Sequence, residues 1–526
     1  MKAFILTVAI IATYFANQSQ SATPCEARRF NHDSVVCVCT ENYCDTLDPI
    51  TRTDAGLVKV YESDRAGKRL EVREVRFGND LPGVDPGRFK NVRVNRDRKF
   101  QEIIGFGTSF TDASALSLGR LSADLQTKVM KSYYSNEGIE YSLSRVVISG
   151  SDFSNRPYSY DDTPNDWSLN SWRLVDEDIN FKIPQMHEAQ RQRGSPIKFI
   201  GSSWSPPAWM KTNGEINHGG TLIGNTGSDE WKTYARYLRK FFEAYRENGL
   251  DFWGMTVQNE PMTGWDPWFP WNTCGFNAEM ERDFVKNDLG PIMEEGGFGP
   301  DRFNIMVLDH NRPLAEDWAN VVFSDNDATK YVKGLAVHWY FYGTAGPYDV
   351  YDRIHDKFPN QFILATEACN RNEDDENDRK GLGKWVLAED YAHDILLDLL
   401  HYVTGWTDWN MVLDMNGGPN WVGNNHSAPI IVNPDEREFY KNVQYYAMAH
   451  FSKFLPPTSS RIETVPGVEE EGLLELGAFE RPDGGTAVII VNTKDNEEYF
   501  NVEDPALGSV KVKVEPHSFN SWVYYR

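Results

Sequence analysis

The sequence lacks long apolar runs and is short of positive charge. Beyond the first 22 residues it has no apolar stretch of the length that a transmembrane helix needs, roughly 18 residues. Its 53 lysine and arginine residues face 77 aspartate and glutamate residues, which gives a formal net charge of −24. Because a phosphate backbone is bound by clustered positive side chains, we expect no nucleic-acid partner. It also lacks a glycine-rich phosphate loop, a metal-ligand cluster and a cofactor motif, so we expect neither metal nor cofactor.

Cysteine is scarce, and its distribution indicates the compartment. Four of the six cysteines crowd the N-terminal region, at Cys25, Cys37, Cys39 and Cys44. They follow a basic start, an apolar run and small polar residues up to Ala22, a pattern typical of a signal peptide over 1–22. An oxidising secretory compartment favours disulfides among these four, in one of three pairings, over the alternative of a zinc site. Cys274 and Cys369 remain as candidates for free thiols.

The middle of the chain alternates short apolar segments with amphipathic helical ones. The segments that qualify as strands are Glu102–Phe110, Ser142–Ser149, Ile197–Trp204, Phe252–Glu260, Phe303–His310, Gly334–Tyr340, Phe362–Glu367 and Val403–Asn410. Eight such units over 101–410 predict a (β/α)8 barrel, since an open doubly wound sheet usually has fewer strands. Residues 57–94 and 473–514 instead alternate polar with apolar residues, which predicts half-buried strands at both ends of the chain.

Polar and aromatic residues stand at the ends of these predicted strands, where the active site of a barrel lies. They are Ser151-Asp152, Ser203-Trp204, Asn259-Glu260, Asp309-His310, His338-Trp339-Tyr340, Thr366-Glu367 and Asp408-Trp409-Asn410. Glu260 and Glu367 each follow an apolar strand directly, and their strands are well separated around the ring, so we expect the two carboxyls to converge across the mouth. Glycoside hydrolysis uses such a pair: one carboxyl protonates the leaving oxygen, and the other attacks the sugar or activates water.

Five motifs carry a resemblance to a known family: WSPPAWMK at 204–211, QNEP at 258–261, AVHWY at 336–340, TEAC at 366–369 and GWTDWN at 405–410. In this order they resemble the glucosylceramidases of glycoside hydrolase family 30, over essentially the whole mature chain. The resemblance implies a lysosomal or secreted retaining β-glucosidase that cleaves glucosylceramide at a membrane surface, with a saposin-like activator protein as a partner. Two alternatives stay open: the same machinery acting on another β-linked glycolipid or glycan, and a catalytically silent lipid- or carbohydrate-binding relative.

The resemblance also implies a role for each site residue. Glu260 stands in the position of the general acid/base and Glu367 in that of the nucleophile. The positions that contact the glucose hydroxyls are matched by Asp152, Trp204, Asn259, Trp409 and Asn424. Arg145 and His338 match residues beside the carboxylates, and Tyr340 matches one that reaches the nucleophile. The sequence itself supports the place of Arg145 beside the carboxylates, because an arginine inside an apolar strand needs a carboxylate partner.

The family architecture implies a β-sandwich built from both chain ends, packed beside the barrel, and a small N-terminal sheet. In that sheet the cysteines would pair as neighbours, Cys25 with Cys37 and Cys39 with Cys44. The implied division is a signal peptide at 1–22, an N-terminal β segment at 23–52 with about 411–442, a sandwich at 53–100 and 459–526, and a barrel at 101–410 and 443–458.

Three features beside the predicted site bear on the substrate. The loop GWDPWFPW at 264–271 is an aromatic cluster that either lines an aglycone site or packs against a neighbouring loop. The acidic run EDDE at 373–376 predicts a solvated face rather than a lipid contact. Asn425-His426-Ser427 is a glycosylation sequon, and a glycan on Asn425 would constrain access to Asn424.

Overall fold

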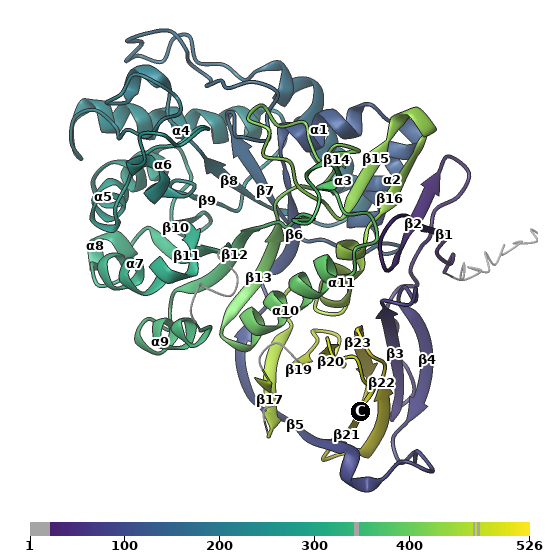
Figure 1. The fold of residues 1–526 in the computed structure, drawn as a ribbon. Helices are drawn as coiled ribbons and strands as arrows, with labels where there is room; N and C mark the ends of the chain where they lie inside the picture. The colour runs from purple at the N-terminus through teal and green to yellow at the C-terminus, as the bar shows by residue number, and fades with distance from the viewer. Residues whose placement is uncertain (1–21, 341–346, 467–468, 471–473) are drawn as a thin grey trace, which may run out of the picture.

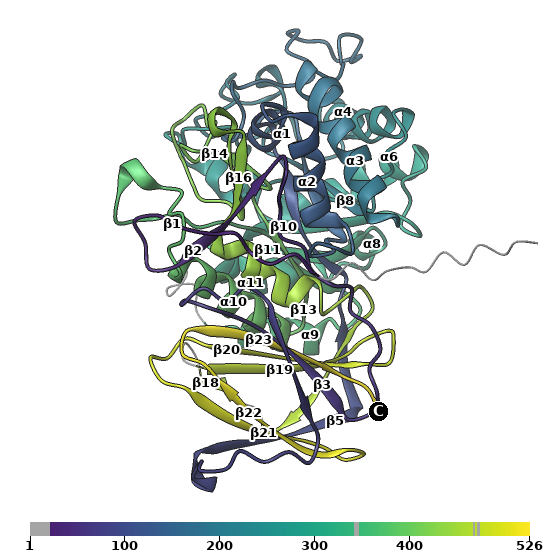
Figure 2. The same cartoon turned by 90° about the vertical axis from the view of Figure 1, so that its right-hand side faces the viewer.

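The computed structural model describes residues 22–340, 347–466, 469–470 and 474–526 (Figure 1). The predicted signal peptide, apart from Ala22, lies outside these residues. Within them, every helix is too short or too polar to cross a bilayer. The described chain forms a closed barrel, a large sheet below it and a small sheet at its side (Figures 1 and 2).

The predicted (β/α)8 barrel is confirmed. Its eight parallel strands are β6 (Gly105–Phe110), β7 (Leu143–Ile148), β8 (Lys198–Ser203), β9 (Gly254–Thr256), β10 (Asn304–Asn311), β11 (Val332–His338), β12 (Phe362–Ala368) and β13 (Val403–Asp408). Gly107 lets β6 approach β7, because a Cβ there would lie 1.8 Å from the carbonyl oxygen of Leu143. β13 pairs with β6 and closes the ring.

Helices cover the outside of the barrel (Figure 1). They are α1 (Asp112–Gly119), α2 (Ala123–Tyr134), α3 (Ile183–Arg193), α4 (Asp229–Glu247), α5 (Ala278–Phe284), α6 (Gly290–Glu295), α7 (Ala315–Val322), α8 (Asn326–Thr329), α9 (Asp349–Lys357), α10 (Val386–Leu400) and α11 (Val443–Ser452). A buried cluster from five strands packs together: Leu143, Ile200, Met306, Ala336 and Leu364. These strand residues precede the polar strand ends, so along each strand the apolar core residues come first and the polar residues of the predicted site follow.

Both chain ends contribute to one ten-stranded sheet, as predicted for the sandwich. Its strands are β3 (Leu57–Asp64), β4 (Glu71–Arg76), β5 (Phe89–Glu102), β17 (Ser460–Val465), β18 (Glu469–Glu470), β19 (Leu474–Glu480), β20 (Thr486–Asn492), β21 (Glu498–Asp504), β22 (Gly508–Val514) and β23 (Ser518–Tyr524). Two hydrogen bonds show that the sheet folds over on itself. Arg73 Nη2 donates to the carbonyl of Lys513 and Asn79 Nδ2 to that of Lys511, each at 2.8 Å. Valines from both layers fill the space between them.

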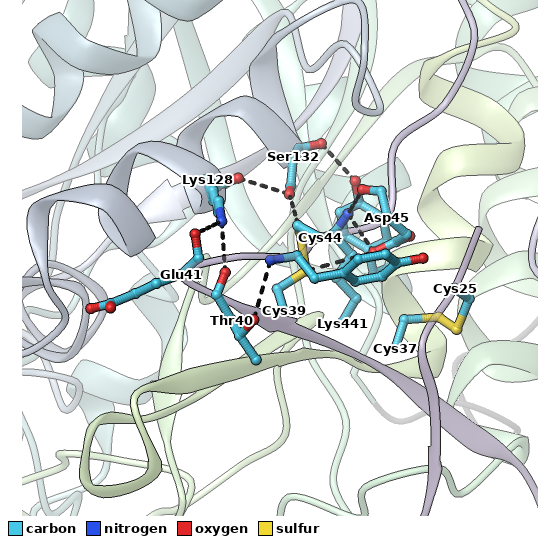
Figure 3. The surroundings of a disulfide bond; sticks show 12 residues. Cys25, Cys37, Cys39, Thr40, Glu41, Cys44, Asp45, Lys128, Ser132 and Lys441 are labelled. Atoms are coloured by element: carbon cyan, nitrogen blue, oxygen red, sulfur yellow. Dashed lines mark hydrogen bonds and ion pairs between the residues drawn. A yellow bond between two sulfur atoms is a disulfide. The ribbon is translucent and has the colours of Figure 1, made fainter. Parts of the chain in front are cut away.

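The small sheet carries both predicted disulfides. It consists of β1 (Ala27–Arg29), β2 (Val35–Thr40), β16 (Glu438–Lys441), β15 (Ile430–Asn433) and β14 (Leu413–Asp414). Cys25 pairs with Cys37 and Cys39 with Cys44. Figure 3 shows what holds this segment in place: Lys128 of α2 ties it to the barrel by donating to the carbonyl of Thr40 at 2.7 Å, and Lys441 of β16, in the same sheet, pairs with Asp45 at 2.9 Å. The cysteines left over, Cys274 and Cys369, are buried free thiols.

Helix α11 joins the barrel to the ten-stranded sheet. His450 on α11 lies between two serines of that sheet, with Nδ1 2.8 Å from the Ser521 hydroxyl and Nε2 2.9 Å from the Ser63 hydroxyl. Burial lowers the pKa of His450 to about 3, so this imidazole is neutral. Beside it, Trp385 stacks on Phe519 with ring centroids 4.9 Å apart.

Candidate active site

A cavity of about 780 Å³ lies at the carboxyl ends of the barrel strands. Eight of the residues predicted from the sequence line it: Asp152, Trp204, Asn259, Glu260, Tyr340, Glu367, Trp409 and Asn424. Arg145 and His338 lie behind the cavity wall, fully buried, and contact the lining carboxyls. The strand ends therefore bring the predicted residues to one place.

Glu367, at the end of β12, is held at both carboxylate oxygens. The Tyr340 hydroxyl donates to Oε1 at 2.9 Å, and the Arg145 guanidinium donates to Oε2. Arg145 projects from β7 inside the barrel, where its burial is compensated by ion pairs with Glu367 and Asp309. These donors fix the orientation of the Glu367 carboxylate.

Glu260 follows β9 in a left-handed backbone conformation, with φ 43°. Its N–H donates to the carbonyl of Asp309 at 2.9 Å, and its Oε1 lies 3.5 Å from His338 Nδ1. The Glu260 side chain is 15% exposed, against 7% for Glu367. Glu260 is thus the more accessible of the two carboxyls.

Asp309 is the centre of the hydrogen-bond network, a role that the sequence did not reveal. Its Oδ1 accepts from His338 Nε2 at 2.9 Å and from the Thr366 hydroxyl at 2.7 Å. Its Oδ2 accepts from Arg145 Nη2 and from the Thr256 hydroxyl, each at 2.6 Å. The donors come from four different strands, so Asp309 fixes the relative positions of β7, β9, β11 and β12. Its only sequence signal was its place at a strand end.

These contacts set the charges of the site. Despite burial, the positive charges of Arg145 and His338 hold the pKa of Asp309 well below its usual range. Burial opposes a charge on His338, but the negative charges of Glu367 and Asp309 raise its pKa to about 9. His338 is therefore an imidazolium at acidic and neutral pH.

The two glutamates titrate together. Burial raises the pKa of Glu367, and the negative charges of Glu260 and Asp309 add to that effect. Burial opposes ionisation of Glu260 as well, but the imidazolium of His338 and the charge of His310 bring its pKa below the usual value. The pair therefore holds a shared proton more readily than an isolated carboxyl would.

Four more of the predicted residues line the cavity, Asp152, Asn424, Trp204 and Trp409. Asn424 Nδ2 donates to Asp152 Oδ2 at 3.3 Å. Burial and the nearby charge of Glu367 raise the pKa of Asp152 to about 7. Trp204 and Trp409 stack on each other with ring centroids 4.8 Å apart, and the Arg145 guanidinium lies 4.7 Å from the Trp204 ring.

The loops around the mouth resolve two expectations. Phe269 and Trp271 of the aromatic loop line the cavity, so this loop forms part of the site. All four residues of the acidic run at 373–376 are exposed, as predicted for a solvated face. Glu373 lines the cavity, because Arg371 and Arg379 bind it at 2.8 and 3.2 Å. Asn425 of the sequon is half-buried beside Asn424, and its glycosylation stays a prediction.

A closed parallel barrel with two carboxyls facing one cavity at its strand ends defines a hydrolase of the glycosidase class. Comparison with known proteins gives the family. The Glycosyl hydrolase family 30 TIM-barrel domain matches residues 103–455, and the beta sandwich domain of the same family matches residues 459–522. The chain belongs to glycoside hydrolase family 30.

Named relatives span nearly the whole chain. Lysosomal acid glucosylceramidase from Mus musculus is 39% identical over 505 residues, 96% of each chain. Putative glucosylceramidase 3 from Caenorhabditis elegans is 38% identical, over 93% of this chain and 92% of its own. The solved structure of SrfJ from Salmonella typhimurium superposes with a TM-score of 0.80 at 26% identity, covering 89% of this chain and 100% of that one.

The buried carboxyls predict greater stability in acid than in base. Burial raises the pKa of Asp408 to about 8. A raised carboxyl pKa means that the folded chain binds more protons than the unfolded chain, so stability declines as pH rises from about 4 towards 8. Below about 6.5 the buried neutral histidines act in the opposite direction, since burial lowers the pKa of both His426 and His450 to about 3. We expect the free energy of unfolding to be largest between about pH 5 and 6.5.

Urea unfolding between pH 5 and 8 measures this dependence. Asp408→Asn removes one titrating group, so its stability should fall less steeply over this range, by up to about 1.4 kcal/mol per pH unit. The exposed Asp356→Asn is the control and should follow the unmodified protein. Parallel curves for Asp408→Asn and the unmodified protein would contradict the assignment.

Proposed function

We propose that this enzyme is a retaining β-glucosidase that hydrolyses glucosylceramide to ceramide and glucose, in the lysosomal lumen or after secretion. The observation that carries the proposal is the pair Glu260 and Glu367 at one cavity, the second held by Arg145 and Tyr340. The substrate and the compartment come from relatives named glucosylceramidase, one of them lysosomal, at 39 and 38% identity.

In the first step the Glu367 carboxylate attacks the anomeric carbon of glucose. The bond from that carbon to the ceramide oxygen breaks, and Glu260 gives its proton to this oxygen. In the second step Glu260 takes a proton from water, the water oxygen attacks the anomeric carbon, and the bond to Glu367 breaks. Two inversions leave the product in the β configuration.

These two steps need Glu367 ionised and Glu260 protonated when the sugar is bound, although the surrounding protein groups raise the pKa of Glu367 and lower that of Glu260. The hydrogen bonds support the required distribution. Both oxygens of Glu367 already accept from donors, so a proton there would displace Arg145 or Tyr340. Positive charge that develops on the sugar ring also favours a carboxylate at Glu367.

The other lining residues fit a glucose ring. Asp152, Asn259 and Asn424 present carboxyl and amide groups that donate to and accept from hydroxyls. Trp204 and Trp409 supply the apolar surface against which sugar C–H groups pack. We assign these five residues to the glucose subsite, with Arg145, His338 and Tyr340 holding the carboxylates.

The two roles predict different losses. Glu367→Gln should reduce turnover by a factor on the order of 10⁴ or more, because an amide is a poor nucleophile. Glu260→Gln should slow substrates with poor leaving groups about 10²- to 10⁴-fold, but spare the first step for activated aryl glucosides and show a burst. Stopped-flow kinetics on an aryl series measures both, and near-normal turnover by Glu367→Gln would refute the assignment.

The product itself tests the whole proposal. Purified protein acting on glucosylceramide in detergent at about pH 5 should release β-glucose first, as followed by proton NMR before mutarotation. Initial α-glucose would exclude retention. If no glucose appears, glucosylceramide is not the substrate, and the alternative of another β-linked glycolipid or glycan applies. A panel of galactosyl lipids and β-glucans then distinguishes these two substrate types.

We further propose that the enzyme meets its lipid at a bilayer surface through the loop that follows Glu260. Met262, Trp265 and Trp268 are 38, 50 and 83% exposed, while Phe269 and Trp271 of the same loop line the cavity. Tryptophan favours the membrane interface, where its apolar ring and polar N–H are both accommodated. A methionine in the same patch fits lipid better than a sugar-stacking platform. The family resemblance adds a saposin-like activator protein that presents the lipid, and we include this partner in the proposal.

Removal of the most exposed ring should weaken surface binding only. Trp268→Ala should lower both vesicle binding and hydrolysis of glucosylceramide in phosphatidylcholine vesicles about 5- to 30-fold, corresponding to a loss of about 1–2 kcal/mol. Hydrolysis of a soluble aryl glucoside should stay unchanged.

Val72→Ala is the matched control, because Val72 is 51% exposed on β4 of the ten-stranded sheet. An equal loss in both variants, or an equal loss on soluble and vesicle substrates, would contradict the surface role. If the unmodified protein cleaves vesicle-bound lipid only after an activator protein is added, the activator makes the bilayer contact instead.

A further inference from the structure

We propose that Glu281, on the outer helix α5, is a positioning residue for the two catalytic carboxyls and acts as a neutral hydrogen-bond acceptor. Its side chain holds the irregular part of β10 from which Asp309 reaches into the barrel. The inference rests on the proposed function, since it assigns a support to Glu260 and Glu367.

The backbone of β10 is distorted where Asp309 leaves it. Leu308 has φ 77° and Asp309 has φ 48°, both in the left-handed region that side chains other than glycine avoid. The pairing of β10 with β11 shifts register between Leu308 and His310, so Asp309 is an extra residue in a bulge. Such strained residues persist where surrounding contacts compensate for them.

Glu281 supplies that contact from outside the barrel. Its Oε2 accepts the Leu308 N–H at 2.9 Å and the Trp318 indole N–H, from α7, at 2.7 Å. The Glu281 side chain is completely buried. The amide of Leu308, turned away from the ladder by the bulge, therefore finds its acceptor on a helix.

The surroundings of Glu281 favour its neutral form. Its Oε1 is buried and has no hydrogen-bond partner among the described residues. Burying an oxygen of an ionised carboxylate without a donor would cost much free energy, so this position favours the neutral acid. Burial raises the pKa of Glu281 to about 8, and the negative charge of Asp309 on β10 adds to this. From α7 it meets the neutral indole of Trp318, and the next buried carboxyl along its own helical segment, Asp288, is engaged with Thr226 and Gly227.

The bulge connects Glu281 to both catalytic carboxyls. The Asp309 carbonyl accepts the N–H of Glu260, and the Asp309 carboxylate fixes Arg145 and His338. Arg145 in turn binds Glu367. If Leu308 lost its acceptor, the bulge would relax, and Glu260 and Arg145 would move together.

Kinetics of Glu281→Leu, Glu281→Gln and Asp288→Leu on aryl β-glucosides tests this role. Glu281→Leu should lower kcat about 10- to 100-fold with KM within threefold, and the dependence on leaving-group pKa should steepen because Glu260 is displaced. Glu281→Gln keeps an uncharged acceptor and should restore kcat to within threefold. Asp288→Leu removes a carboxyl that is equally buried in the same helical segment but contacts a loop, so its kcat should not change.

Three outcomes would overturn the inference. They are unchanged kcat in folded Glu281→Leu, an equal loss in Glu281→Gln, and an equal loss in Asp288→Leu. Circular dichroism and thermal unfolding establish that each variant folds, and Glu281→Asp, one methylene too short to reach Leu308, replaces the leucine variant if that one does not.

A crystal structure of the variant separates this inference from the proposed function. It should show the Asp309–His338 contact broken, whichever substrate the enzyme takes; an intact contact would overturn the role of Glu281. If the unmodified protein cleaves no β-glucoside, the proposed function fails and the bulge remains testable by this structure.

Discussion

A guanidinium buried inside the barrel is the constraint on which the rest of the active site depends. Arg145 is removed from water by β7 and by the stacked rings of Trp204 and Trp409, so its charge has to be balanced within the barrel. Glu367 and Asp309 supply that balance directly. With His338 the cluster contains two cations, against the three carboxyls of Glu260, Glu367 and Asp309. It is therefore neutral when the two glutamates share one proton, which is the state that acid-assisted glycoside cleavage requires.

The sequence allowed prediction of those parts that follow from local patterns. Eight apolar segments gave the barrel, and the rule that its chemistry lies at the strand ends placed Glu260 and Glu367 in one cavity. Asp309 also stood at a strand end, but its importance comes from the bulge at Leu308 and Asp309, which no glycine marks. A positive φ in such residues is imposed by tertiary hydrogen bonds, here from α5, and a single sequence does not display them.

The acidic run at 373–376 is a solvated face, as its pattern predicts, and all four of its residues are exposed. A row of charges predicts a solvated face when its counter-ions are unknown. Here Arg371 and Arg379 bind Glu373 and draw it to the cavity rim, whereas Asp374 extends outward to Lys384. Pairing between loop residues thus decides which of these exposed acidic side chains lies at the rim of the cavity. The aromatic loop bears out the alternative of a cavity wall through Phe269 and Trp271, while its Trp265 and Trp268 are exposed, which the sequence did not predict.

That double use of the loop connects chemistry with lipid access. Glu260 is followed at once by the short helix η4 (Pro261–Trp265), so the proposed acid caps the same helical turn that carries the exposed Met262 and Trp265. The Asp266 carboxylate accepts the N–H of Trp268 at 2.8 Å and fixes the turn that presents this ring to solvent. A net charge of −24 gives no attraction to an anionic bilayer, so binding to a membrane would depend on apolar contact. A lipid that entered between Trp268 and Trp271 would pass from the surface to the carboxyls along a single loop, which explains why one segment of the chain carries both the acid and the aromatic rings.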